Sequence, residues 1–234
     1  MSVLALTARV LRDPAGLVAE HDTADGLARV APSLLVVAAS GAAVFGAAVG
    51  SYRGGVQTLY AALKMPVLLV LPPLLVLPAL AAAWRACDVE TSRRRLALAA
   101  LAGMARTGVL AAAMAPALWL PYSVRVDYHL AVVLMAGALA FVGLPGLVTI
   151  ARTAVGGQHR FLATAGCLFL LGLVTAQTGW LLRPFVARPR ADVALFRPIE
   201  SDVISSISAT ASAATGDYRE WEPEEAGFLG RRSE

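Results

Sequence analysis

The 234-residue chain is 58% hydrophobic and only 15% charged, and its mean hydropathy is +0.67. Soluble domains balance apolar and charged residues far more evenly, so the composition excludes that class and indicates an integral membrane protein. The net charge of +4 does not indicate binding to nucleic acid, because the basic residues lie in joints between apolar runs. We expect the anionic headgroups of the lipid bilayer to be their counter-charge.

The first 29 residues are polar, with a few apolar residues spaced among the charged ones. This pattern predicts a short helix in the membrane interface, followed by a polar lead-in to the first span. The segment has no positive region at its start and only a short apolar run before Arg9, so we expect no cleaved signal peptide.

The first predicted span covers residues 31–50, about the 20 apolar residues that a helix needs to cross a bilayer. A small residue recurs at every fourth position of this span, at Ala38, Ala42, Gly46 and Gly50. Such a stripe allows close packing between two helices in lipid. An alanine-rich span also produces this pattern by chance, and the sequence leaves both interpretations open.

The second predicted span covers residues 65–84 and follows a joint at residues 51–64. Each internal proline removes a backbone hydrogen bond, so we expect this helix to be kinked or broken. Irregular backbone at membrane depth must be covered by protein or water, which predicts burial in the bundle or a place beside a cavity. A structural kink and a transport path are both compatible with the four prolines, Pro66, Pro72, Pro73 and Pro78.

Three more spans are predicted at residues 96–120, 129–150 and 161–182. The joint before the third span is the most basic, with Arg85, Arg93, Arg94 and Arg95, and we interpret it as a contact surface for lipid headgroups or a partner. The positive-inside rule places this joint in the cytoplasm. The expected protein is a multi-pass protein of the cytoplasmic (inner) membrane, with its N-terminus in the cytoplasm and its C-terminus outside.

Residues 186–234 form a polar tail in which apolar residues at helical spacing predict a short surface helix after Pro198. We expect disorder after about residue 215, where the chain becomes acidic. The sequence therefore predicts an all-α, polytopic transmembrane bundle of about five spans. Its segments are an interfacial N-terminal part (1–29), a five-helix membrane domain (30–185) and the tail (186–234).

The predicted spans contain no aspartate or glutamate, and the chain has no HExxH, CxxC or GxSxG motif. The histidines, His21, His129 and His159, lie at span edges or in the N-terminal lead-in, far from any metal-ligand spacing. Cys87 is placed in a loop and Cys167 inside a span, so a disulfide is not expected. We therefore predict no catalytic residue, metal or cofactor, and a protein that is not an enzyme.

Two polar residues within spans are candidate intramembrane sites. Arg106 lies well inside the third span, where a charge is costly unless it is paired. It is either a functional group or a headgroup anchor, if the span begins near Thr107. Gln177 lies in the fifth span and either bonds to backbone exposed by the prolines of the second span or caps an end near Trp180.

Two stretches, GGVQTLYAALKMPVLLVLPPLL and LAGMARTGVLAAAMAPALWLP, each have a short amphipathic run that enters a proline-bearing span. This order of elements over residues 30–185 resembles the Yip family of five-helix membrane proteins and its bacterial relatives. The resemblance implies a cytoplasmic N-terminus and a non-enzymatic protein that binds partners or shapes membrane. The single lysine among twenty basic residues and the many alanines suggest a bacterial source.

Two functions follow as hypotheses. The first is a non-catalytic scaffold, assembly or trafficking-type partner in a membrane complex, bound to other membrane proteins or to copies of itself. The alternative is a permease or channel subunit for a small, anionic solute, in which the second span and Arg106 line a path. An enzyme acting on lipid is a third and less favoured possibility, because polar residues from several loops would have to meet.

Overall fold

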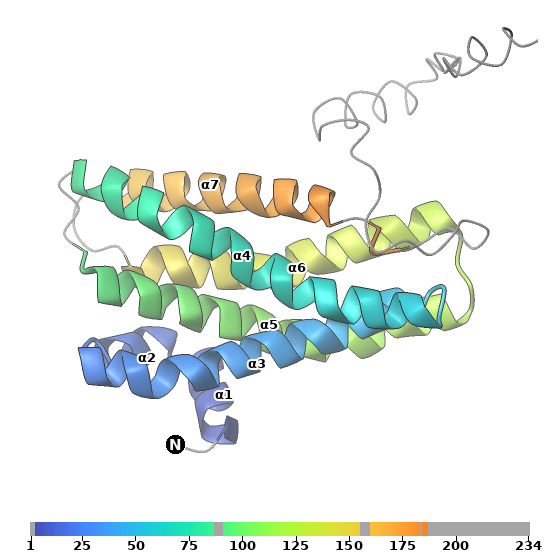
Figure 1. Ribbon diagram of the computed structural model, residues 1–234, viewed down its shortest axis with the longest axis horizontal. Helices are drawn as coiled ribbons and strands as arrows, with labels where there is room; N and C mark the ends of the chain where they lie inside the picture. Colours follow the sequence, from blue (N-terminus) through green and yellow to red (C-terminus); the bar gives the residue numbers. More distant parts are fainter. Residues whose placement is uncertain (1–2, 87–90, 155–159, 183, 187–234) are drawn as a thin grey trace, which may run out of the picture. The chain divides into compact units, whose positions relative to one another are not determined.

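The computed structural model describes residues 3–86, 91–154, 160–182 and 184–186, which belong to one compact unit, Met1–Arg197. Within these residues the secondary structure is entirely helical, which confirms the predicted all-α fold (Figure 1). The predictions for the tail lie outside the described residues. The helices are α1 (Val3–Arg12), α2 (Pro14–Glu20), α3 (Ala24–Gly50), α4 (Val56–Ala86), α5 (Arg93–Ser123), α6 (Tyr128–Ala154) and α7 (Arg160–Leu181).

Five of these helices are long and apolar enough to cross a membrane, in agreement with the five predicted spans. Each contains a stretch of at least 18 residues that meets the length of a bilayer crossing. The chain is thus a multi-pass membrane protein. The candidate spans are Ala24–Gly50, Val56–Arg85, Arg93–Ser123, Leu130–Ala154 and Thr164–Leu181.

The joint expected at residues 51–64 is wrong, because α4 already begins at Val56. The turn between α3 and α4 is short and includes Gly54 and Gly55, whose positive φ angles of 79° and 59° favour glycine. The polar residues that suggested a joint, Gln57 and Lys64, are instead buried side chains of the helix.

The N-terminal segment contains two helices rather than one. Asp13 separates them by capping α2, since its carboxylate accepts a hydrogen bond from the Gly16 amide at 2.8 Å, and Pro14 suits the first helical turn. Arg9 and Glu20 form an ion pair between the helices. The hydrogen bond from Arg9 holds the pKa of Glu20 below its ordinary value.

The apolar faces of α1 and α2 are buried against α3 and α5. Leu6, Val10, Leu17 and Val18 pack with Val30, Leu34 and Val37 of α3 and with Leu98, Ala102 and Ala105 of α5. The short helices therefore lie beside the first turns of the two long ones. At their outer surface Val3 and Leu4 are exposed, as expected for a helix that meets lipid.

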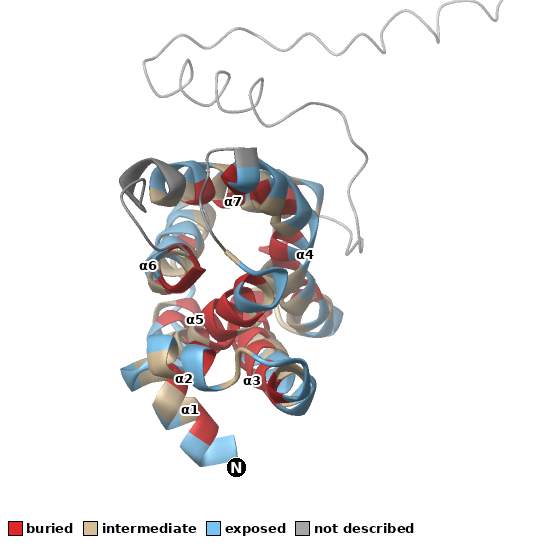
Figure 2. Ribbon diagram, turned by 90° about the vertical axis from the view of Figure 1, so that its left-hand side faces the viewer, coloured by how far each residue is buried: buried red, intermediate tan, exposed pale blue. Residues whose placement is uncertain are grey.

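Helix α5 lies at the centre of the bundle, in contact with α3, α4 and α6, as the end-on view shows (Figure 2). Its contacts with two neighbours are backbone to backbone. A Cβ added at Gly41 of α3 would lie 2.0 Å from the carbonyl oxygen of Gly108, and one added at Gly103 would lie 2.7 Å from that of Gly146 in α6. Glycine is required at these crossings because a side chain would separate the helices.

Helix α4 is continuous from Val56 to Ala86, so of the two alternatives, kinked or broken, the break is excluded and the kink stays a prediction. The neighbouring α7 packs along it, and the two helices lie on the side of the bundle away from α1 and α2 (Figure 1). Of the four prolines, Pro72 and Pro73 are buried, Pro66 is half-buried and Pro78 is exposed. Among these prolines, the expected burial is therefore seen only at the two in the middle of the helix.

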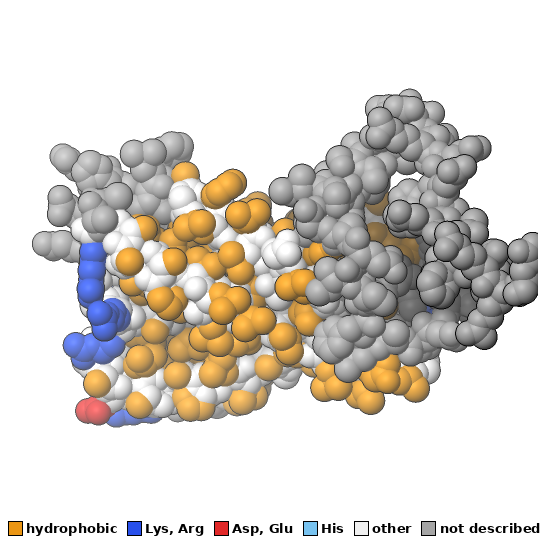
Figure 3. All heavy atoms as spheres, turned by 45° about the horizontal axis from the view of Figure 1, so that its top comes forward, with side chains coloured by type: hydrophobic (Ala, Val, Ile, Leu, Met, Phe, Trp, Pro, Cys, Tyr) orange, Lys and Arg blue, Asp and Glu red, His pale blue; other side chains and the backbone are white. Residues whose placement is uncertain are grey.

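Hydrophobic side chains cover the middle of the face shown in Figure 3, and basic side chains gather at one end of it. At that end lie the start of α5, with Arg93, Arg94 and Arg95, and the end of α4, with Arg85. An apolar belt with a basic rim is the distribution expected for helices that end at a lipid headgroup layer.

Candidate functional site

The predicted small-residue stripe of α3 faces the interior of the bundle. Ala38 and Ala42 are buried against α5, since a Cβ added at Gly108 would lie 2.6 Å from the Ala38 carbonyl oxygen. Gly46 and Gly50 instead approach the first turns of α4. A Cβ at Gly46 would lie 2.3 Å from the Ala61 carbonyl oxygen, and one at Gly50 would lie 2.6 Å from that of Gln57. The stripe therefore meets two helices in succession.

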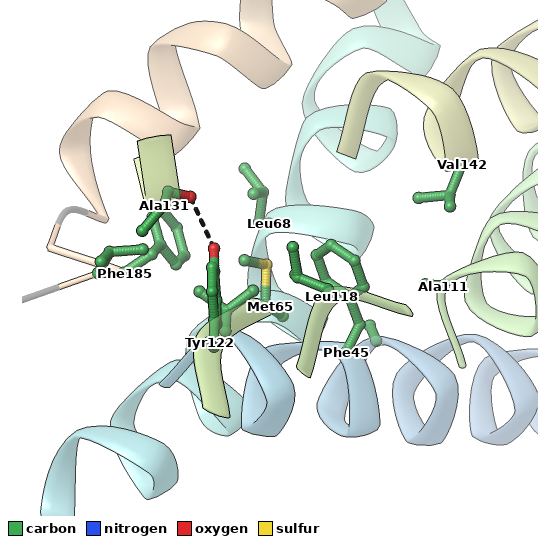
Figure 4. Packing of buried hydrophobic residues seen from close by; sticks show 12 residues of the cluster. Phe45, Met65, Leu68, Ala111, Leu118, Tyr122, Ala131, Val142 and Phe185 are labelled. Carbon is green, nitrogen blue, oxygen red and sulfur yellow. Dashed lines mark hydrogen bonds between the residues drawn. The ribbon is translucent and has the colours of Figure 1, made fainter. Parts of the chain in front are cut away.

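A cavity of about 830 Å³ lies between the α4–α7 pair and the α5–α6 pair. Its walls come from all five long helices and from residues 184–186, which follow α7. The lining side chains are almost all apolar and include Phe45, Met65, Leu68, Pro73, Val142 and Phe185. In Figure 4, Phe45, Met65 and Leu68 lie close together in the middle of the view, with Phe185 to their left and Val142 to their right.

The polar groups on the cavity wall are few and uncharged. Thr107, Thr175, Tyr128 and Trp180 are the lining residues with a polar side-chain atom. The hydroxyl of Thr175 donates to the Leu171 carbonyl at 2.6 Å and is thereby satisfied within α7. Among the described residues no charged side chain lines the cavity, so its surface suits an apolar molecule or the apolar part of an amphipathic one.

One end of the cavity is lined by the segment at residues 184–186, which is held by side chains of α4. Gln57 Nε2 donates to the carbonyl oxygens of Pro184 at 3.1 Å and Phe185 at 2.8 Å. Lys64 Nζ donates to the Pro184 carbonyl at 3.3 Å and lies 5.9 Å from the centroid of the Phe185 ring. Since a buried polar group needs partners, these contacts explain why the first half of α4 carries Gln57 and Lys64 at buried positions.

Tyrosine hydroxyls join the helix ends nearby. Tyr122 of α5 donates to the Ala131 carbonyl of α6 at 2.7 Å, drawn as the dashed line in Figure 4. Tyr52, in the turn after α3, donates to the Val126 carbonyl at 2.9 Å, and its ring packs edge-on against that of Tyr122 at 5.3 Å. The α3–α4 turn and the α5–α6 connection are thus joined to each other and to the adjacent helix ends.

Arg106 points toward α6, away from the cavity lining. Its Nη1 donates to the Thr149 hydroxyl at 2.8 Å, and the same hydroxyl donates to the Pro145 carbonyl at 2.7 Å. The Nε atom of Arg106 is buried and has no hydrogen-bond partner among the described residues. The guanidinium is therefore half-buried and only partly satisfied.

The remaining predicted basic residues are exposed at the ends of α4 and α5. Arg85, Arg93 and Arg94 are exposed, and Arg95 is exposed except where its Nε donates to the Thr153 carbonyl at 3.1 Å. The start of α5 is fixed by Ser92, whose hydroxyl accepts from the Arg95 amide at 3.0 Å. The arginines thus project from an ordered helix end.

Gln177 lies on an exposed face of α7. No hydrogen bond in the described part of the chain joins it to α4, so the cross-helix contact considered for it is absent from this structure. The described residues also contain no group of three His, Cys, Asp or Glu side chains that could hold a metal ion.

The sequence did not indicate that residues 184–186, Gly103 and Gly146 belong to the site. Residues 184–186 contribute to the cavity only because α4 binds their carbonyl groups, a contact over more than 120 residues. Gly103 and Gly146 bring α5 and α6 together, but single glycines in two spans carry no pairing signal. The buried Gln57 was the available clue, because a polar residue inside an apolar helix predicts a partner.

Comparison with protein-family models, with curated proteins and with solved structures finds no match to this chain. The resemblance to the Yip family stays a prediction, and function is argued from the geometry of the cavity.

Proposed function

We propose that this protein is a non-catalytic membrane protein that binds a lipid-like molecule in the cavity between the α4–α7 pair and the α5–α6 pair. The observation that supports this is the cavity itself, about 830 Å³ in volume and lined by apolar side chains within the membrane-spanning helices. Ligand sites of proteins occupy about 300–1,000 Å³, so the volume suits an acyl chain or another small apolar molecule.

The lining favours such a ligand over the small anion of the channel hypothesis. A charged solute that enters an apolar cavity loses its hydration, and this cost is repaid only by charged or polar partners. No described lining residue is charged, and Arg106 lies outside the lining. An acyl chain has no hydration to lose and gains dispersion contacts with the wall.

The ligand is tested by filling the cavity at a glycine. Gly172 of α7 lines the cavity, and a Cβ added there meets no atom within 4 Å. Gly172→Leu should lower the affinity of the purified, detergent-solubilised protein for an anthroyloxy-labelled stearic acid at least tenfold, measured by fluorescence titration, because the new side chain occupies the space of the probe.

The control is Gly166→Leu on the same helix. Gly166 is exposed, has equally open surroundings and does not line the cavity. Its substitution should change the affinity less than twofold. Equal losses in the two variants, or the absence of saturable binding to the unmodified protein, would count against the proposal.

A second proposal is the scaffold role, which the exposed arginines at the ends of α4 and α5 support. If these arginines face the cytoplasm, they present a charged surface to an acidic partner protein. Purification in mild detergent should then recover a stoichiometric partner that is lost when Arg93 and Arg94 are both replaced by glutamine. Recovery of the same partner by both proteins would remove this surface from the interaction.

A further inference from the structure

We propose that Arg95 and Arg106 together bind the phosphate group of an anionic membrane lipid, beside the turn of α6 that carries Thr149 and Thr153. This site is separate from the proposed function, because none of the four residues lines the cavity.

The two arginines converge on one turn of α6. They are eleven residues apart in α5, a rise of about 16 Å, yet the groups that they bind belong to residues four apart in α6, a rise of about 6 Å. Arg106 reaches the Thr149 hydroxyl from one direction, and Arg95 reaches the Thr153 carbonyl from the other. Their guanidinium groups are therefore closer together than the backbone positions from which they extend.

Neither arginine has a described carboxylate partner. Arg106 forms one hydrogen bond to a neutral hydroxyl, whereas a guanidinium has five N–H donors. Its Nε is buried and has no partner in the described residues, so the protein satisfies this guanidinium only in part, and a ligand from outside meets its remaining donors rather than the buried Nε. A cation within a membrane span is costly unless it is paired, so an anion from outside the chain is the expected partner.

A lipid phosphate is the anion that fits this position. The planar fork of arginine matches the oxygens of a phosphate, and two such groups surround one phosphate from two directions. Arg95 is exposed and Arg106 is half-exposed, so the site is open to the surroundings of the bundle. The exposed Arg93 and Arg152 at the same end attract anionic headgroups to it.

The test measures the melting temperature of the full-length protein in a neutral detergent with added lipid. Phosphatidylglycerol should raise the melting temperature in a saturable manner, because a ligand that binds only the folded state stabilises it. Phosphatidylcholine and inorganic phosphate at the same concentration should leave it unchanged. A rise with inorganic phosphate alone would identify a site for the free ion, and equal rises with both lipids would exclude charge recognition; either result overturns the proposal.

Variants separate the site from a general effect of charge. Arg106→Gln and Arg95→Gln should each raise, at least tenfold, the phosphatidylglycerol concentration that gives half of the maximal rise in melting temperature. Arg94→Gln removes the same charge from the same helix end but no contact with α6, and it should change the effect less than twofold. Equal losses in Arg94→Gln and Arg106→Gln would overturn the proposal.

A third variant guards against the possibility that Arg106→Gln does not fold. Arg106→Lys keeps the charge but replaces the fork by a single ammonium group, so we expect a folded protein with a several-fold weaker response to phosphatidylglycerol. An undiminished response would show that the fork geometry is not used and would contradict the site as described.

Discussion

Two sides of this helix bundle are packed by different means. On one side α3, α5 and α6 meet through glycines, so that backbone atoms of Gly41 and Gly108 are in direct contact. On the other side the α4–α7 pair packs against α5 and α6 only over part of its length, around Trp84 and Leu96, and a cavity of about 830 Å³ lies between the pairs beyond that contact. The wall of α4 there consists of larger side chains and a buried proline, among them Met65, Leu68 and Pro73.

The difference shows how a membrane protein keeps an internal space. Lipid tails are as apolar as the helices, so helices associate by close packing and not by the hydrophobic effect. Where small residues allow such packing, the bundle is closed. Where the helices do not approach each other so closely, they leave a space lined by small and large apolar residues, which an apolar molecule fills without loss of hydration.

The largest expected effect on stability comes from adding a methyl group at a glycine of the closed side. Gly41→Ala should lower the free energy of unfolding by about 1–3 kcal/mol, because the new Cβ would lie 2.0 Å from the Gly108 carbonyl oxygen and the helices would have to separate. Unfolding by denaturant in detergent micelles measures this change.

The matched control for that variant is Gly137→Ala in α6, where an added Cβ meets no atom within 4 Å. Alanine is the better helix former, so this substitution should leave the protein as stable as before or increase its stability by about 0.5–1 kcal/mol. If both variants lost the same stability, the close approach of α3 and α5 would not be what holds the closed side together.

A smaller effect is expected at the end of the open side. Gln57→Leu removes the donor to the Pro184 and Phe185 carbonyls and should cost about 1–2 kcal/mol, since buried acceptors lose a partner. Lys64 still donates to Pro184, which favours the lower part of this range. The measurement is again denaturant unfolding.

Gln177→Leu, at an exposed position of α7, is the comparison for that change and should have an effect within about 0.5 kcal/mol. A cost for Gln57→Leu no greater than that of Gln177→Leu would indicate that α4 does not hold the 184–186 segment in solution.

The smallest expected effect is a pH dependence of the stability of α1 and α2, which pack at the edge of the closed side. The pKa of Glu20 is lower in the folded protein, so its ion pair with Arg9 favours the folded arrangement at neutral pH. This contribution is lost as the pH falls through that lowered pKa, below the ordinary value of about 4.3.

Hydrogen exchange of the α1 amides measures this loss. Relative to Glu20→Gln at the same pH, the wild-type protein should be better protected at pH 6, and the difference should vanish at strongly acidic pH. A difference that persists there would show that the carboxylate does not act through its charge.

Much of the fold could be predicted because the bilayer imposes one rule on every span. The apolar run before Gly50 and the run between the arginines at 93–95 and Tyr122 each correspond to one helix, because the length of a crossing is fixed. The start of α4 could not be located, since the polarity of Gln57 and Lys64 suggested a loop. Their burial depends on carbonyl groups of the segment after α7, which sequence near α4 does not reveal.

The candidate site was predictable only in part. The prolines of the second span predicted either burial in the bundle or a place beside a cavity, and Pro73 is buried and lines one. The other walls of the cavity depend on which helices become neighbours. The sequence around Gly172 or Val142 does not indicate that these residues face a cavity. Arg106 was recognisable from its charge, but its partner Thr149 was not, because a threonine inside an apolar span ordinarily bonds to its own helix.

The small residues of α3 have a consequence for the order of assembly. Gly46 and Gly50 meet α4, which the ribosome completes first, whereas Gly41 meets Gly108 of α5, which is synthesised later. The α3–α4 hairpin can close as soon as it has entered the bilayer, while the surface around Gly41 waits for its partner. Since that surface is small and uncharged, its temporary exposure to lipid costs little.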